Sequence, residues 1–116
     1  YTRQTIVYSP NHKRAFCYID DAIKQIVRLS INKKTNKEIF NIGNMKEEFS
    51  IIQIANKIKN LVLKKSKIKK GNNTPGSPFR RVPDMKKTIK YSRIKNFTSF
   101  DNGLKKTVNW YLNNYK

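Results

Sequence analysis

The chain has 116 residues, the length of one ordinary domain, and carries a net charge of +19 from 26 basic and 7 acidic residues. Apolar residues and glycine make up about 35 % of it, below the roughly 45–50 % usual in globular domains, so we expect a thin core. No apolar run reaches the ~18 residues of a membrane span and no leader peptide is visible, so we expect a cytoplasmic chain that contacts no membrane. The single cysteine (Cys17) and single histidine (His12) exclude an internal disulfide and a zinc site.

The positive charge is spread along the whole sequence. Twenty of the 26 basic residues are lysine, accompanied by 14 asparagines and 14 isoleucines, which indicates a compositional drift and predicts only nonspecific contact with nucleic acid. The one dense run lies within 64–70 and has two interpretations, a solvated helix end or a phosphate-binding stripe. Because it leads into a segment rich in glycine, asparagine and proline, we expect a mobile loop over about 64–79.

Short strands and amphipathic helices alternate in the first half of the chain. Residues 5–8 and 14–19 favour strands, separated by a turn, and a helix is expected over about 21–31. Asp20 and Asp21 stand where acidic residues cap a helix start. The apolar residues of this helix recur at helical spacing: Ile23, Ile26, Val27 and Ile31.

A second strand and helix pair follows, and two further helices complete the chain. After a loop over 32–37, residues 38–42 indicate a buried strand. Ser50 and Gln53 form a capping box before a helix over about 51–64. Asp84 is the expected N-cap of a short helix that ends near Tyr91, and Ser99 that of the last helix.

The predicted fold is therefore α/β, a single region over 1–116 with few strands and about four helices. A sheet of two or three strands leaves helix faces without partners, so we expect this region to pack against something larger, either more of the same chain or another subunit.

Few residues are placed to do chemistry. The glycines stand only at positions 43, 71, 76 and 103, so no dinucleotide or phosphate loop is present, and no catalytic residue, cofactor site or metal site is predicted. Cys17 is expected to be buried and inert, and His12 to be exposed in a turn. Tyr91 and Lys95 match Tyr-x-x-x-Lys, but the pair would meet only on a continuous helix, and we expect Tyr91 to end one and to pack in the core.

Three arginines lie beside structured turns: Arg14 enters a strand, while Arg80 and Arg81 precede a helix. Guanidinium forks suit phosphate oxygens, so a phosphorylated ligand is one interpretation. The other is that these arginines pair with Asp20, Asp84 or backbone carbonyls.

The order of motifs is more specific than any one of them. In chain order the blocks are Arg14–Asp21, Ile39–Asn44, Ser50–Ala55, Arg80–Asp84 and Ser99–Leu104, followed by Thr107 and Trp110–Tyr111. Together they resemble the C-terminal half of the extended short-chain dehydrogenases/reductases, the NAD-dependent nucleotide-sugar epimerases, dehydratases and decarboxylases. The resemblance covers about residues 5–111.

The resemblance implies a substrate-binding C-terminal region, normally packed on a Rossmann half that carries the glycine loop, NAD(P) and the catalytic Tyr and Lys. This region would bind a nucleotide diphosphate sugar and, without its Rossmann half, in the same or a separate chain, would have no activity. Arg14 and Arg81 match the family's diphosphate-binding arginines, with Arg80 as a neighbouring candidate. Asp21 and Asp84 match recurring acids that we interpret as helix caps.

The sequence also departs from the family pattern. Thr74 replaces a further arginine, Ser77 stands where aspartate is usual, and residues 93–96 replace a Gly-Trp-x-Pro-like turn. Asn41 and Gly43 match the strand-end turn near the junction of the two halves. Two alternative functions stay open at this point: a basic module that binds a polyanion such as RNA, and a module for subunit assembly, including a homo-oligomer.

Overall fold

The computed structural model describes residues 4–62 and 64–115 and confirms the α/β prediction. The strands are β1 (Gln4–Val7), β2 (Lys13–Ala15), β3 (Glu48–Ser50), β4 (Lys67–Lys70) and β5 (Arg80–Arg81). The helices are α1 (Ile19–Ser30), α2 (Ile51–Val62), α3 (Lys86–Ser92) and α4 (Phe100–Asn114), with a 3-10 turn, η1 (Lys33–Thr35).

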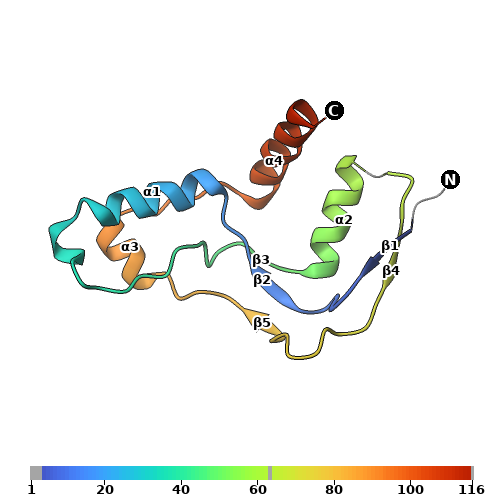
Figure 1. Cartoon of the computed structure of the whole chain (residues 1–116), viewed down its shortest axis with the longest axis horizontal. Coiled ribbons are helices and arrows are strands. Elements are labelled where there is room, and N and C mark those ends of the chain that lie inside the picture. Colours follow the sequence, from blue (N-terminus) through green and yellow to red (C-terminus); the bar gives the residue numbers. More distant parts are fainter. Residues whose placement is uncertain (1–3, 63, 116) are drawn as a thin grey trace.

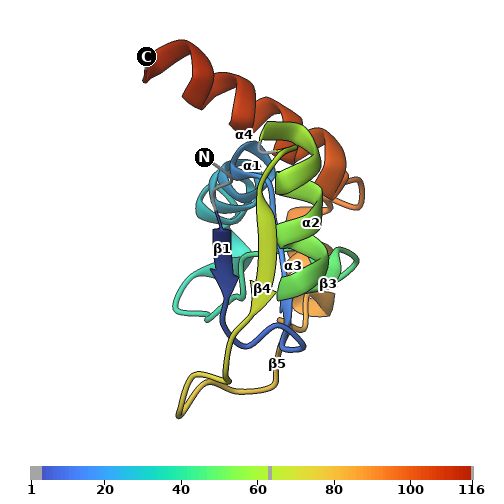
Figure 2. The ribbon, with the colours of Figure 1, turned by 90° about the vertical axis from the view of Figure 1, so that its right-hand side faces the viewer.

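The strands form two small sheets. In one, β1 and β4 pair in parallel, and α2 lies beside them (Figure 2). In the other, β2 is the central strand, antiparallel to β3 and parallel to β5. Helices α1 and α3 lie together at one end of the molecule, α2 and the β1–β4 pair at the other, with β2 between them (Figure 1).

The molecule is extended and exposes much surface. Its radius of gyration is 16.9 Å, whereas a compact domain of this length would have about 13 Å. Its accessible surface is 9000 Å², against about 6,600 Å² for a compact monomer of this mass. This excess agrees with the expectation that helix faces are left without partners.

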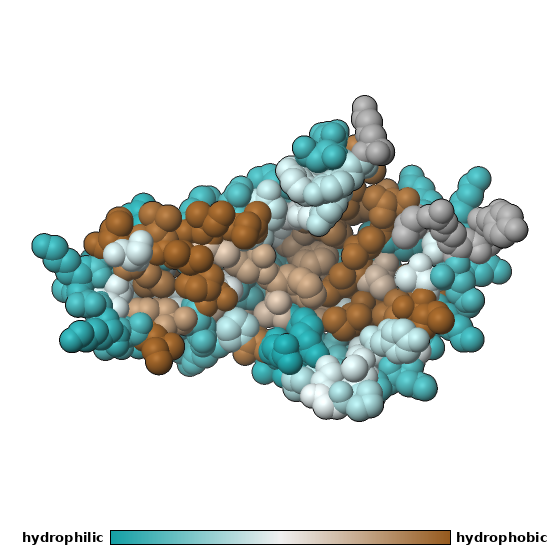
Figure 3. Space-filling view, viewed as in Figure 1, coloured by the Kyte–Doolittle hydropathy of each residue, from teal (hydrophilic) through white to brown (hydrophobic). Residues whose placement is uncertain are grey.

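Hydrophobic burial is correspondingly sparse. The buried apolar residues within the described ranges are Val7, Leu29, Ile54 and Met85. The predicted apolar residues of α1 are all exposed, and they form part of the hydrophobic surface over α1 (Figure 3). The sequence therefore correctly predicted an apolar face on this helix, but no residue that the structure describes covers that face. In the described ranges no helix has the length and hydropathy needed to cross a membrane.

Two predicted helix caps are confirmed, and the third is displaced by one residue, because the N-cap of α3 is Met85. At the start of α2, the Gln53 amide N–H donates to Ser50 Oγ at 3.3 Å, and the Ser50 N–H donates to Gln53 Oε1 at 2.8 Å. At the start of α4, Ser99 Oγ accepts the N–H of Asn102. Asp84 Oδ1 accepts the N–H of Lys86, so it caps the first turn of α3 from one residue further out than predicted.

Helix α1 begins differently from the prediction. It starts at Ile19 without a side-chain cap, and β2 ends at Ala15, four residues before the predicted end of that strand. Asp21 is not a helix cap: it is 3 % exposed, and its Oδ2 accepts the N–H of Thr98 at 2.6 Å. The carboxylate ties α1 to a segment far along the chain, a contact that local sequence does not reveal.

The predicted strand over 38–42 is wrong. No described strand pairs with this segment, and its carbonyl groups accept from side chains instead. Lys87 Nζ donates to the Ile39 carbonyl at 3.0 Å, and Thr88 Oγ1 to that of Asn41 at 2.5 Å. The residues have strand-forming character, but a strand also requires a neighbour.

Most of the basic run is a strand and not a helix end: Lys64 and Lys65 lie in a turn, and the strand follows. Residues 67–70 form β4, with Ile68 turned partly inward opposite Thr5 on β1 and the lysines exposed. The predicted loop is therefore shorter than 64–79, and α2 ends at Val62; Leu63 lies outside the described residues.

Candidate functional site

The structure brings together two arginines that lie 67 positions apart in the sequence. Parallel pairing of β2 with β5 sets Arg14 opposite Arg81. Directly paired residues project from the same face of a sheet, so both side chains leave the same face of β2 and β5. The antiparallel partner of Arg14 on β3 is Phe49, which shares this face.

The guanidinium group of Arg14 is held by neutral partners. Its Nη1 donates to the Lys13 carbonyl at 2.7 Å and its Nη2 to Ser77 Oγ at 2.8 Å. A guanidinium has five N–H groups, so three remain for a ligand as far as the described residues show. The alternative prediction, that these arginines pair with acidic side chains or backbone carbonyls, is thus confirmed in part for Arg14, because one of its partners is a backbone carbonyl.

Arg81 is exposed, and no ion pair or hydrogen bond of its side chain occurs within the described ranges. None of the acidic side chains described there lies within ion-pair distance of Arg14 either. Two like charges directly opposite each other destabilise a sheet. An anion bound between them would remove this repulsion, and a diphosphate has the matching charge.

Arg80 projects to the opposite face and has an acidic partner. Its Nε and Nη2 donate to the two carboxylate oxygens of Glu48 at 2.7 and 2.9 Å, a bidentate ion pair across the central strand β2. Hydrogen bonding to Arg80 lowers the pKa of Glu48 below its ordinary value. The pair joins β5 to β3, and a ligand role for Arg80 stays a prediction.

Two residues beside Arg14 were not identified as site residues from the sequence. Ser77 lies in the loop before β5, and its Oγ is 3.4 Å from His12 Nδ1. His12 was predicted to be exposed, which is wrong: it is 4 % exposed and packs edge-on against Phe79 with ring centroids 5.5 Å apart. The replacement of the usual acid by Ser77 was visible in the sequence, but the contact between His12 and Phe79 depends on the fold.

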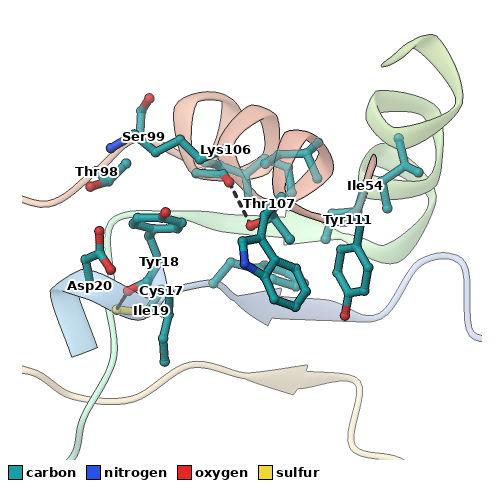
Figure 4. Close-up of a pocket in the computed structure, with 16 residues that line it drawn as sticks. Cys17, Tyr18, Ile19, Asp20, Ile54, Thr98, Ser99, Lys106, Thr107 and Tyr111 are labelled. Carbon is teal, nitrogen blue, oxygen red and sulfur yellow. Dashed lines mark hydrogen bonds between the residues drawn. The ribbon is translucent and has the colours of Figure 1, made fainter. Parts of the chain in front are cut away.

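A separate groove of about 700 Å³ lies between α4, α2 and the segment that joins β2 to α1 (Figure 4). Its walls are largely apolar and aromatic, including Tyr18, Ile54 and Tyr111, with Lys106 Nζ 5.2 Å from the ring of Tyr18. Cys17 also lines it, and burial raises the pKa of this thiol, with a further contribution from the charge of Asp21.

The predicted end of a helix near Tyr91 is confirmed. Helix α3 ends at Ser92, and Arg93 has a left-handed backbone with φ of 59°, so Lys95 lies beyond the helix. Tyr91 packs against Phe40 with ring centroids 5.5 Å apart. In the part of the chain that the structure describes, no three His, Cys, Asp or Glu side chains lie together in a way that could hold a metal ion.

The glycines of this chain serve packing and turns. A Cβ on Gly43 would lie 3.0 Å from Pro83 Cγ, and one on Gly103 would lie 3.2 Å from Tyr18 Cδ2. None of the four stands in the strand-to-helix turn that cradles a dinucleotide.

Known proteins similar to this chain include nucleotide-sugar enzymes. UDP-glucuronic acid decarboxylase 6 of Arabidopsis thaliana is 36 % identical over 74 residues, which are 64 % of this chain and 21 % of that protein. The bifunctional polymyxin resistance protein ArnA of Wigglesworthia glossinidia brevipalpis is 30 % identical over 127 residues, 95 % of this chain and 19 % of that protein. The chain thus spans about a fifth of the length of these relatives. No protein-family model matches the sequence.

The fold has close counterparts among solved structures. The crystal structure of UDP-glucuronic acid 4-epimerase from Bacillus cereus, in complex with UDP-glucuronic acid and NAD, matches 95 % of this chain with a TM-score of 0.82 and 26 % identity. The match covers 35 % of the epimerase chain. The chain therefore belongs to the extended short-chain dehydrogenases/reductases, the family of NAD-dependent epimerases and dehydratases, and corresponds to the C-terminal portion of its members.

Proposed function

We propose that this chain is the substrate-binding portion of a nucleotide-sugar epimerase, dehydratase or decarboxylase, and that Arg14 and Arg81 bind the diphosphate of the substrate. The observation that carries the proposal is the register of β2 and β5, which sets these two arginines opposite each other. Each guanidinium can donate two N–H groups to phosphate oxygens, and the pair supplies two positive charges.

The proposal divides the work between this chain and a Rossmann half. NAD(P) and the residues that move protons and hydride would belong to that half, because the glycines of the described residues form no strand-to-helix turn of the kind that cradles a dinucleotide. The exposed apolar face of α1 supports such a partner, since its burial needs a second surface. The chain by itself is then expected to bind substrate and to have no turnover.

Calorimetric titration of UDP and UDP-glucuronic acid into the 116-residue chain tests the binding role. Arg14→Ala and Arg81→Ala should each weaken binding at least ten-fold, because a hydrogen bond to a charged group contributes ~1.5–3 kcal/mol. Arg28→Ala is the matched control: Arg28 is an exposed arginine on α1, and its loss changes the net charge by the same amount. It should leave the affinity within two-fold of wild type.

Two results would contradict the proposal. Equal weakening by all three substitutions would mean that only net charge matters, and binding of random oligonucleotides with a steep salt dependence would then favour a polyanion ligand. Turnover of UDP-glucuronic acid by the isolated chain with added NAD would overturn the division of work between the two halves.

A further inference from the structure

A short chain of polar groups runs inward from Arg14. Arg14 Nη2 donates to Ser77 Oγ at 2.8 Å, and Ser77 Oγ lies 3.4 Å from His12 Nδ1. The three residues come from β2, from the loop before β5 and from the turn before β2. His12 at the inner end is almost fully buried, so the line leads from the half-buried guanidinium into the protein.

The direction of the hydrogen bonds follows from the groups themselves. A guanidinium only donates, so Ser77 Oγ accepts from Arg14. The Ser77 hydroxyl hydrogen is then free to donate to His12 Nδ1, in the tautomer that has its proton on Nε2. Successive hydrogen bonds polarise one another, so the bond to His12 makes Ser77 Oγ a better acceptor for the guanidinium.

His12 is itself fixed by the fold. Its N–H donates to the Ser9 carbonyl at 3.0 Å, and its own carbonyl accepts the N–H of Ile51, at the start of α2, at 3.0 Å. Its ring packs edge-on against Phe79, whose carbonyl accepts the N–H of Lys13 at 2.7 Å. The inner end of the line is thus anchored to α2 and to the segment that leads into β5.

We propose that Ser77 and His12 are positioning residues that hold the Arg14 guanidinium in place for the diphosphate; this rests on the proposed function. Ordering a flexible arginine side chain when a ligand binds costs conformational entropy and weakens binding. A side chain that is already ordered in the free protein avoids this cost. A neutral hydroxyl orders Arg14 without cancelling its charge. An aspartate at position 77 would order it equally well but would form an ion pair and reduce its attraction for phosphate.

The first measurement needs no ligand. In the ligand-free chain, NMR of arginine labelled with 15N reports how fast the Arg14 guanidinium rotates. Ser77→Ala should accelerate this rotation several-fold, His12→Phe should do so to a smaller extent, and Ser77→Thr should leave it as in wild type. His12→Phe keeps a ring against Phe79 but removes the acceptor. Ser30→Ala is the control, because Ser30 Oγ donates to the Val27 carbonyl on the exposed side of α1.

The second measurement is calorimetric titration of UDP into the same variants. Ser77→Ala should raise the Kd about three- to ten-fold, the range expected for ordering one side chain on binding, while Ser77→Thr should stay within two-fold of wild type. Ser77→Asp should affect the two measurements differently: rotation of the Arg14 guanidinium should stay as slow as in wild type, while the affinity for UDP should fall. A role in folding alone would not produce that difference.

The outcomes distinguish this proposal from the one on which it rests. If wild type fails to bind UDP while Ser77→Ala still accelerates the guanidinium, Arg14 is positioned as proposed but the diphosphate role fails. If Ser77→Ala leaves the rotation unchanged, or if Ser77→Thr behaves like Ser77→Ala, the positioning role is overturned whatever the affinity for UDP.

Discussion

Helix α1 presents two faces of opposite chemistry. The face turned toward α3 and the loops buries Asp21, Gln25 and Leu29. The other face leaves five large apolar side chains between 49 % and 72 % exposed: Ile19, Ile23, Ile26, Val27 and Ile31. An ordinary surface helix has the reverse arrangement, with apolar residues inward and polar residues outward.

Hydrogen bonds hold the inner face. The Gln25 side chain, which is fully buried, donates from Nε2 to the Gly43 carbonyl at 2.9 Å and accepts the Gly43 N–H on Oε1 at 3.1 Å. The buried carboxylate of Asp21 accepts from Thr98. The outer face is mainly hydrophobic, and its apolar area contributes to stability when a second surface removes it from water. On α1, therefore, the polar inner face completes its contacts within this chain, whereas no described residue covers the apolar outer face.

The largest expected effect is a difference in the free energy of unfolding between substitutions at Gln25 and Ile26, neighbouring positions on opposite faces of α1. Gln25→Ala should lower the free energy of unfolding by about 3 kcal/mol or more, because it leaves the buried N–H and C=O of Gly43 without partners. Ile26→Ala, the matched substitution on the exposed face, should change it by less than ~0.5 kcal/mol. Urea denaturation followed by circular dichroism measures both. Similar losses at the two positions would show that the outer face is buried in solution.

A smaller effect is expected from the carboxylate on the inner face. Asp21→Asn keeps the shape but removes the charge that strengthens the bond from Thr98, so it should cost about 1–2 kcal/mol of stability. Asp20→Asn, at an exposed position in the same first turn, loses only a favourable interaction with the helix dipole, ~0.3–1 kcal/mol. The same denaturation experiment ranks the two. A larger loss at Asp20 would argue for the helix-cap interpretation.

The smallest effect is expected at the exposed ion pair between Glu48 and Arg80. Because Arg80 lowers the pKa of Glu48, the pair stabilises the fold above the ordinary glutamate pKa of about 4.5, and this contribution disappears as the pH falls through the lowered value. The denaturation midpoint of wild type should therefore fall more between pH 7 and pH 3 than that of Glu48→Gln. Arg80→Ala should reduce the pH dependence in the same way. An unchanged pH dependence in both variants would mean that the pair is absent in solution.

The sequence was most informative where structure depends on neighbours along the chain. The capping box of Ser50 and Gln53, the cap at Ser99 and the end of α3 near Tyr91 each involve residues within a few positions of one another. Their hydrogen bonds join residues that are close in the sequence, so residue type and spacing were sufficient to predict them.

The failures concern contacts between distant segments. Residues 38–42 have the composition of a strand but no neighbouring strand, whereas the two arginines of β5 have little strand character and pair with β2 because the loop before them returns there. His12 is buried because Phe79 packs against it, and Asp21 because Thr98 reaches it. The family pattern named Arg14 and Arg81, but their shared face appears only once the register of β2 and β5 is known.

Because β2 and β5 pair over only a few residues, the effect of an inserted residue depends on whether it falls within a strand or in the loop before β5. Side chains alternate between the faces of a strand, so one residue inserted between Lys13 and Arg14 would send Arg14 to the side of the sheet that carries Glu48. Extra residues in the loop between β4 and β5 leave that alternation untouched, because they lie outside both paired strands. Evolution or engineering can therefore lengthen this loop while the spacing of the two arginines is preserved.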